Sequence, residues 1–180
     1  MACGQTPVTA KGTFPKQAHH DDTCAVPADP FNLLFVNEKS ASLAATLRGL
    51  KNSDTKQVWK SPRIGGVIPT ARNQWAMIDG SCKVQDEQRV TGSLWDRYHI
   101  RLWDLNNGDV LACAHHENLL TLGGNPPRAH LHRVDAFESG KDSVCDDFRA
   151  NTYKRIQQNA LIMGNYKRVP YCSGLAALIA

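Results

Sequence analysis

Residues 97–103 alternate strictly between polar and apolar side chains, in the order RYHIRLW. Such alternation predicts a β-strand with one apolar face. Asn107-Gly108 follows shortly afterwards, and this dipeptide favours a two-residue hairpin turn because both positions of that turn need a positive φ. The apolar residues 110–114 then supply the return strand. The fold is therefore expected to be built around an antiparallel strand pair.

The register of this strand pair decides which side chains meet. If the dipeptide forms the whole loop, Asn106 lies opposite Asp109. Counting back then places His99 opposite His116 on the polar face. The same face carries the other polar-side residues of the first strand, which are Arg97, Arg101 and Trp103. A slip of one residue would move a whole strand to the other face, so the predicted site depends on this register.

Five of the seven histidines gather in the middle of the chain: His99, His115, His116, His130 and His132. Titratable and cationic side chains packed this densely onto predicted strands indicate a polar site. Residues 129–135 also alternate, which puts His130 and His132 on one face and Arg133 and Asp135 on the other. Any chemistry of the chain is expected to lie in this region.

An enzyme is one hypothesis for this site. His99 and His116 would act as general acid and base near neutral pH. The arginines would hold an anionic group such as phosphate or carboxylate through charge-assisted hydrogen bonds. The catalytic set of this hypothesis is His99, Arg101, His116, His132 and Asp135. Such an enzyme would be a hydrolase that acts on a phosphate-containing or other anionic substrate.

A metal site is the second hypothesis. His130 and His132 share a predicted face, and His115 is close in the sequence. His115 or His116 together with Glu117 would complete a set of nitrogen and oxygen ligands for zinc or a similar ion. The spacing His-x-His is common and specifies no particular ion, so no cofactor is expected, with zinc as the alternative.

A binding module is the third hypothesis, and the sequence narrowly favours it. The polar face would recognise a protein, a cell-wall fragment or a lipid headgroup, with Arg97, Trp103 and Arg133 as ligand-binding residues and Trp95 as a further anchor. The fourth alternative is structural, with the histidines hydrogen-bonded inside the fold. Nucleic acid is not expected as a partner, because the net charge is only +4, basic and acidic residues interleave, and 7% of residues are aromatic.

The remaining apolar pattern predicts a single α+β domain. A buried strand is expected at 31–36, a helix from a Ser40 N-cap to Leu50, a second helix at 139–150, and strands at 160–163 and 175–179. The polar residues 81–92 are expected to form a helical turn or a surface loop. Together these segments predict a mixed, largely antiparallel sheet flanked by two main helices, spanning residues 29–180.

The N-terminal residues 1–28 are rich in proline, threonine and polar side chains, and they predict a flexible tail. Ala2-Cys3-Gly4 matches the end of a bacterial lipoprotein signal, in which the cysteine is lipidated; an ordinary Met-Ala start is the alternative. Six cysteines without a CxxC pair fit disulfides better than a zinc ribbon. These features favour a lipid-anchored protein of the bacterial periplasm or outer membrane, with a cytoplasmic protein as the alternative.

Five short segments in the same order resemble the LssY C-terminal domain family of bacterial proteins. They are residues 29–36, 97–103, 112–117, 132–147 and 169–174. In that family the match to Cys172-Ser173-Gly174 looks more like Thr-Asp-Gly, so an acidic residue is missing here. The resemblance implies a fold and a bacterial origin, and it implies no catalytic mechanism.

Overall fold

The computed structural model describes residues 15–36, 42–51, 59, 73–93, 96–122, 129–150, 156–162 and 175–180. Its helices are α1 (Leu43–Lys51) and α2 (Phe137–Ala150). Its strands are β1 (Gln17–His19), β2 (Pro27–Pro30), β3 (Leu33–Phe35), β4 (Trp75–Ile78), β5 (Ser81–Val84), β6 (Glu87–Gly92), β7 (Asp96–Asp104), β8 (Val110–Leu122), β9 (Ala129–Ala136), β10 (Ile156–Ile162) and β11 (Leu175–Ile179). None of the helices described is long and apolar enough to cross a membrane.

The strands form two sheets. The larger sheet has the order β10-β11-β3-β8-β7-β6, with β9 also pairing to β8, and the smaller sheet has the order β2-β1-β4-β5. Among the pairings of the larger sheet, β3 with β11 is parallel and the others are antiparallel. The predicted α+β class with a mixed, largely antiparallel sheet is therefore confirmed.

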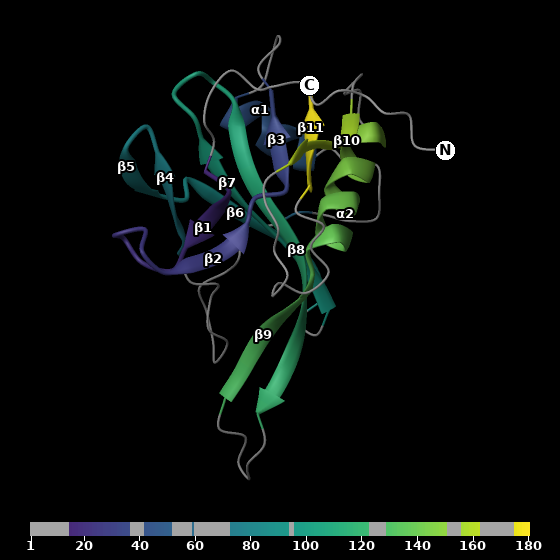
Figure 1. Cartoon of the computed structure of the whole chain (residues 1–180). Coiled ribbons are helices and arrows are strands. Elements are labelled where there is room, and N and C mark those ends of the chain that lie inside the picture. The colour runs from purple at the N-terminus through teal and green to yellow at the C-terminus, as the bar shows by residue number, and fades with distance from the viewer. Residues whose placement is uncertain are drawn as a thin grey trace.

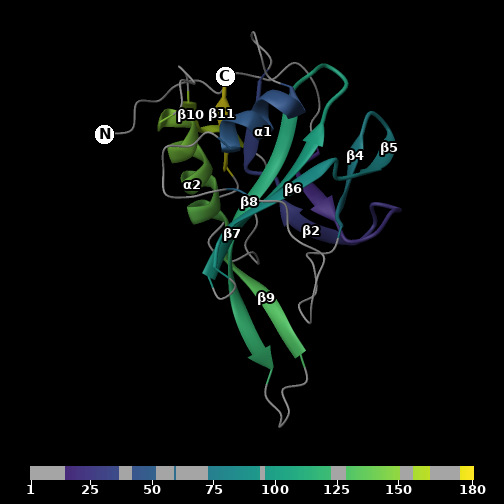
Figure 2. The same cartoon turned by 180° about the vertical axis from the view of Figure 1, so that it is seen from behind.

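Both helices pack on one face of the larger sheet, and the smaller sheet covers the other face (Figures 1 and 2). On the helix side, Leu50 and Phe148 bury against Ile100 and Leu102 of β7. On the opposite side, Ala18 and Ala76 of the smaller sheet bury against Trp103. These opposite placements follow from the two-residue period of β7, because neighbouring side chains of a strand point to opposite faces of the sheet.

The N-terminal segment departs from the prediction. Residues 17–19 and 27–30, which we expected to be part of a flexible tail, form β1 and β2 of the smaller sheet. A disulfide between Cys24 and Cys82 joins this segment to β5, so the disulfide expectation is confirmed for one pair. Residues 1–14, with Cys3, lie outside the described residues. The predicted loop at 81–92 is likewise replaced by β5 and β6.

The hairpin between β7 and β8 forms, but with a longer loop than predicted. The Leu105 N–H donates to the carbonyl of Asp109, and the Gly108 N–H donates back to the carbonyl of Leu105, each at 2.9 Å. Gly108 has a positive φ of 87°, while Asn107 does not fall in that region and instead accepts the Asp109 N–H on its own Oδ1 at 2.9 Å. The loop is thus the three-residue type, in which a glycine forms a bulge.

The extra loop residue shifts the register by one. His99 lies opposite His115, and Tyr98 lies opposite His116. The predicted pairing of His99 with His116 is therefore wrong. Since side chains alternate along β8, the shift sends His116 to the helix-side face of the sheet and brings His115 to the face that carries His99.

Asn32 fills a gap along one edge of β8. At one end of that edge β3 pairs with residues 110–112, and at the other end β9 pairs from His116 onwards. Between them, the Asn32 side chain accepts the Ala114 N–H at 2.8 Å and donates to the Ala114 carbonyl at 2.7 Å. It also donates to the carbonyl of Phe137 at 3.0 Å, which ties the start of α2 to the sheet.

Gly140 sets how closely α2 approaches β8. A Cβ atom at this position would lie 2.4 Å from both the backbone N and the Cα of His115. The predicted helix at 139–150 is confirmed as α2, and its first turns rest directly on the strand that carries the polar site. The helix at 43–51 is confirmed too, but its N-cap is Ser42, whose Oγ accepts the Ala45 N–H at 3.1 Å. Ser40 lies outside the described residues.

Candidate metal site between the two sheets

Polar side chains line the face of β7 and β8 that looks toward the smaller sheet. In the register of β7 and β8, Arg97 lies opposite Glu117, His99 opposite His115, and Arg101 opposite Cys113. Opposed residues of an antiparallel pair share a face, so all six groups point the same way. His116 is not among them, because it packs against the ring of Tyr98 at 4.9 Å and contacts the Asp96 carboxylate.

This polar face is buried. His99 and His115 have no exposed surface, and Glu117 and Arg101 retain 4% and 5%. Trp103 is also fully buried, packs edge-on against Phe31 with ring centroids 5.0 Å apart, and donates its indole N–H to the carbonyl of Lys83 at 3.2 Å. The expectation that Trp103 anchors a partner is therefore wrong, because this tryptophan is a core residue.

Glu117 is the acceptor at the centre of the cluster. Arg97 places Nε and Nη2 at 2.6 Å from Glu117 Oε2. His99 Nδ1 and His115 Nε2 lie 3.0 Å and 2.7 Å from Glu117 Oε1. Burial works to raise the pKa of Glu117, but the hydrogen bonds from His115 and His99 outweigh it and hold that pKa far below its ordinary value. Glu117 is therefore a carboxylate at neutral pH.

Asp29 is the second buried carboxylate, and it comes from β2 of the smaller sheet. Its Oδ2 accepts from Arg101 Nη1 at 2.6 Å and from Gln74 Nε2 at 2.8 Å. Burial works to raise the pKa of Asp29, but the charge of Arg101 and the other contacts of this carboxylate lower it below its ordinary value. Asp29 thereby connects the smaller sheet to β7 and β8 through charged contacts.

His99 is a neutral imidazole within this cluster. Burial, and then the nearby charge of Arg101, lower its pKa to about 3, against the opposing effect of Glu117. Because Nδ1 faces the Glu117 carboxylate, Nδ1 carries the ring hydrogen and donates it. Nε2 is then an acceptor and lies 3.1 Å from Gln88 Oε1, so this tautomer requires the Gln88 amide to be turned to donate its NH2 group.

This neutral histidine predicts a pH dependence of stability. The pKa of His99 falls from 6.5 to about 3 on folding. Between these two pH values, His99 binds a proton in the unfolded chain but not in the folded chain. The contribution of the neutral His99 to the free energy of unfolding is complete above pH 6.5 and is lost as the pH falls toward 3. Between pH 7 and pH 5 the unfolding free energy should drop by about 2 kcal/mol more in the wild type than in His99→Gln.

The measurement is urea unfolding at several pH values, with EDTA present so that protons are the only ions that titrate. His20→Gln serves as the control, because His20 is exposed and lies outside the cluster. Its pH curve should run parallel to that of the wild type. If the His99→Gln curve also runs parallel to the wild type, His99 is not held neutral by its surroundings.

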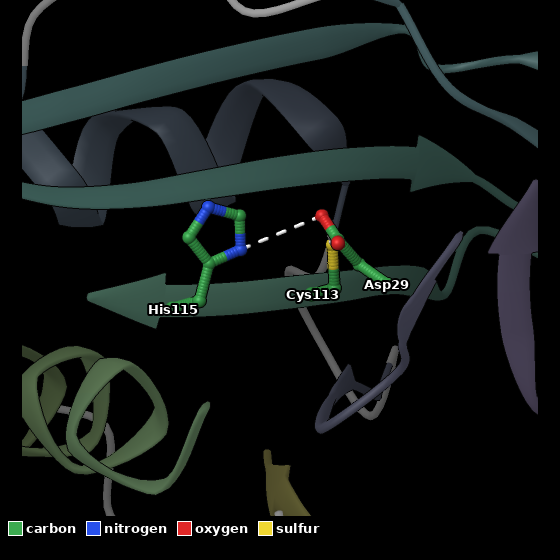
Figure 3. A group of neighbouring side chains, drawn as sticks. All are labelled: Asp29, Cys113 and His115. Atoms are coloured by element: carbon green, nitrogen blue, oxygen red, sulfur yellow. Dashed lines mark hydrogen bonds and ion pairs between the residues drawn. The ribbon is translucent and has the colours of Figure 1, made fainter. Parts of the chain in front are cut away.

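Two groups of side chains in this cluster have the spacing of metal ligands. They are Asp29, Cys113 and His115, and His99, His115 and Glu117, with the ligand atoms of each group within 4.8 Å of one another. The second group is already joined by hydrogen bonds through Glu117. The first group is open only at His115 Nδ1, which lies 3.5 Å from Asp29 Oδ2 (Figure 3). The Cys113 thiol donates to the same oxygen at 3.9 Å.

The tautomer of His115 explains why the first group is open. Its Nε2 donates to Glu117, so in the neutral ring Nδ1 carries a lone pair. That lone pair is buried, has no hydrogen-bond partner within the described part of the chain, and faces the Asp29 carboxylate, which is also an acceptor. Two acceptors facing each other are satisfied by a cation between them. The ligand atoms of tetrahedral zinc lie about 3.3–3.8 Å apart, given bond lengths of about 2.0–2.3 Å.

Two further polar atoms near Asp29 are buried without a partner among the residues described. They are Gln74 Oε1 and Arg101 Nε. Buried polar groups are normally hydrogen-bonded, so the unpaired Gln74 Oε1, which is an acceptor, points to a missing donor or cation beside Asp29. Arg101 Nε is a donor, and a cation would not satisfy it. Burial, followed by the Asp29 charge, raises the pKa of the Cys113 thiol, so this sulfur becomes a thiolate only when a cation binds it.

The predicted site residues separate into three sets. Arg97, His99 and Arg101 lie in the cluster, together with His115. His116 lies on the opposite face, so the predicted acid–base pair of His99 and His116 does not form. Of the predicted β9 residues, His130, His132 and Arg133 pair with β8 at or beyond Asn118, and Asp135 lies at the register irregularity between His116 and Glu117. Their side chains, like all of Trp95, lie outside the part of the chain that is described.

Sequence reasoning missed three members of the site: Asp29, Gln74 and Cys113. Cys113 carried a signal, because it alternates with His115 and Glu117 in the run CAHHE. Asp29 carried no such signal, because 84 positions of the sequence separate it from Cys113, which it contacts on β8.

Searches of protein-family models, curated proteins and solved structures find no match. The resemblance to the LssY C-terminal domain family, the lipidation of Cys3 and a location in the bacterial envelope therefore stay predictions.

Proposed function

We propose that this domain is a metal-binding protein whose ion is held by Asp29, Cys113 and His115, and that zinc is the first ion to test. The observation that carries the proposal is the buried His115 Nδ1, which has no hydrogen-bond partner among the described residues and faces a carboxylate and a thiol. Sulfur, imidazole nitrogen and carboxylate oxygen together form a ligand set for zinc and related transition metals.

The surroundings of His115 fit the role of a metal ligand. Histidines that bind metals usually donate their other ring hydrogen to a carboxylate, which fixes the tautomer and the ring orientation. Glu117 accepts that hydrogen at 2.7 Å, and Arg97 in turn holds Glu117. Asp29 is oriented in the same way by Arg101 and Gln74.

The burial of the site favours binding over hydrolysis. A catalytic metal needs an open position that substrate and water can reach. Here the two ligands on β8 have no exposed surface beyond 1% of the His115 side chain, and the Asp29 side chain retains 13%. The binding module expected from the sequence thus takes a metal ion as its ligand, and a protein or envelope partner would use another face.

The ligands come from both sheets, so the ion would also hold the sheets together. Asp29 belongs to the smaller sheet, and the other two ligands belong to the larger one. A metal that binds only the folded arrangement stabilises it by mass action. We therefore expect the melting temperature to rise with the ion concentration.

The direct test is a titration of chelator-stripped protein with Zn²⁺, followed by calorimetry, and with Co²⁺, followed by its thiolate charge-transfer absorption. One ion per chain is expected. Cys113→Ala should weaken binding by about 100-fold or more and abolish the thiolate absorption of the cobalt form. Circular dichroism checks that each variant is folded.

Cys145→Ala is the matched control. Cys145 is a second buried thiol, but it lies in α2 on the helix side of the larger sheet. Its replacement should leave affinity and stoichiometry unchanged. The proposal fails if the wild type binds no ion, or if Cys113→Ala binds as tightly as Cys145→Ala.

A further inference from the structure

We infer that Gln74 supplies the fourth ligand of the proposed metal site, through its side-chain oxygen Oε1. This inference rests on the proposed function and completes its ligand set. The ion would then be held by the Cys113 sulfur, the His115 ring nitrogen, an Asp29 carboxylate oxygen and the Gln74 amide oxygen. A site of this kind is closed, because no position on the ion is left for water or a substrate.

The Gln74 side chain is buried beside Asp29 with its oxygen unpaired. Gln74 is 4% exposed, and it directly precedes β4. Its Nε2 donates to Asp29 Oδ2 at 2.8 Å, which fixes the orientation of the amide group. Turning the amide over would place its oxygen against the carboxylate oxygen, and two acceptors repel each other. Oε1 is therefore the atom that is left without a partner among the described residues.

Two unpaired acceptors meet at the same carboxylate oxygen. The Gln74 amide reaches Asp29 Oδ2 through its nitrogen, and His115 Nδ1 lies 3.5 Å from that oxygen. Gln74 Oε1 and His115 Nδ1 are both buried, and neither has a hydrogen-bond partner within the described part of the chain. Buried acceptors are normally satisfied, so two of them beside one carboxylate need a common explanation. One cation beside Asp29 would satisfy both.

The burial of the site favours a fourth ligand from the protein. Structural zinc is bound by four ligands in a tetrahedron, and the proposed site already has three. Cys113 and His115 have no exposed surface, and the Asp29 side chain retains 13%. A glutamine oxygen also serves as a metal ligand beside thiolate and imidazole in other proteins. Gln74 Oε1 has the burial, the lone pairs and the neighbour that this role requires.

The four ligands would come in two pairs. Cys113 and His115 alternate along β8 of the larger sheet, so they share a face. Asp29 lies on β2 and Gln74 at the start of β4, and β1 runs between these two strands of the smaller sheet. The hydrogen bond from Gln74 to Asp29 brings the second pair together. Each sheet would therefore hold the ion with two ligands.

The test uses the Co²⁺ form of the full chain, whose d–d absorption reports the number of ligands. The wild type should show the intense bands of four-coordinate cobalt, and added azide should leave them unchanged because every position is filled. Gln74→Ala opens one position, so azide should bind there and shift the bands. Affinity for Zn²⁺, measured against a fluorescent zinc chelator, should fall by about tenfold or more in this variant.

Gln74→Glu separates a ligand from a residue that only positions Asp29. Glutamate keeps an oxygen at this place, but its carboxylate has no N–H to donate to Asp29. If Gln74 is a ligand, Gln74→Glu should bind Zn²⁺ about tenfold more tightly than Gln74→Ala and should resist azide. If Gln74 only positions Asp29, both variants lose affinity to the same extent and azide shifts the cobalt bands of both.

Gln17→Ala is the matched control. Gln17 is a half-buried glutamine on β1 of the same sheet, opposite Pro30. Its replacement should leave the zinc affinity and the resistance to azide as in the wild type. Circular dichroism checks that the variants fold. If Gln74→Ala does not fold, the azide titrations of the wild type and Gln74→Glu still decide, together with X-ray absorption of the wild-type zinc form, which should show one sulfur and three nitrogen or oxygen neighbours.

The outcomes separate this inference from the proposed function. A wild type that binds neither zinc nor cobalt contradicts both. Three results overturn Gln74 as a ligand and leave the metal site standing: azide shifts the cobalt bands of the wild type, Gln74→Ala binds Zn²⁺ as tightly as Gln17→Ala, or Gln74→Glu loses as much affinity as Gln74→Ala.

Discussion

Replacing Glu117 with glutamine should lower the free energy of unfolding by about 3–5 kcal/mol, the usual cost of removing one partner of a buried ion pair. The loss is large because one carboxylate serves three donors, which are Arg97, His99 and His115. A glutamine side chain has the same outline, but it leaves the Arg97 guanidinium, whose side chain is only 13% exposed, without an anion. Urea unfolding at pH 7 measures the effect.

Glu87→Gln is the matched control. Glu87 also pairs with an arginine, Arg89, at 2.5 Å, but its side chain is 33% exposed and it lies at the sheet edge on β6. Its replacement should cost less than that of Glu117, because the Glu87 side chain is partly exposed and Arg89 keeps its hydrogen bond to the Gln88 carbonyl at 2.8 Å. Equal losses in the two variants would show that Glu117 is not the centre of a buried network.

Replacing Asn32 with leucine should cost about 3 kcal/mol or more. The leucine has a similar volume, but it leaves the N–H and carbonyl of Ala114 and the carbonyl of Phe137 without the bonds that Asn32 supplies. Each buried backbone group left unpaired costs about 1–3 kcal/mol. Urea unfolding measures the loss, and hydrogen exchange at Ala114 should speed up selectively.

The comparison variant for Asn32 is Asn106→Ala. Asn106 is an exposed asparagine in the hairpin loop, so its replacement should change the free energy of unfolding by less than about 1 kcal/mol. An Asn32→Leu protein as stable as Asn106→Ala, with slow exchange retained at Ala114, would refute the bridging role of Asn32 along β8.

Local patterns in the sequence predicted most elements of the fold. The alternation at 97–103 identified β7, and the apolar run at 31–36 identified β3 as a buried strand. These predictions succeeded because two-residue alternation and continuous apolar runs reflect burial directly. The segment 17–30 was misjudged, because short strands held by a disulfide need little apolar surface of their own.

The register of the hairpin could not be predicted from the same patterns. Both a two-residue and a three-residue loop accept Asn-Gly, and the choice depends on whether Asn107 adopts a positive φ or bonds its side chain to Asp109. That choice moved His116 out of the site and His115 into it. In the run CAHHE, one histidine of the adjacent pair always faces the site, and the loop determines which one.

Asp29 shows a second limit of sequence reasoning. Its contact with Arg101 and its approach to Cys113 arise from the packing of one sheet on the other. The local alternation of polar and apolar residues cannot predict such a contact between two sheets. The metal ligands predicted on β9 came from a His-x-His pattern, whereas the open ligand group of the structure combines a strand of each sheet.

The most direct measurement of the central claim is an anomalous difference map from crystals of metal-loaded protein, collected above the absorption edge of the bound ion. The proposal predicts one peak within about 2.0–2.3 Å of Cys113 Sγ and His115 Nδ1. Asp29 should remain bonded to Arg101 in that structure. A peak on β9 at His130 and His132, or no peak in protein loaded with one equivalent of ion, would contradict it.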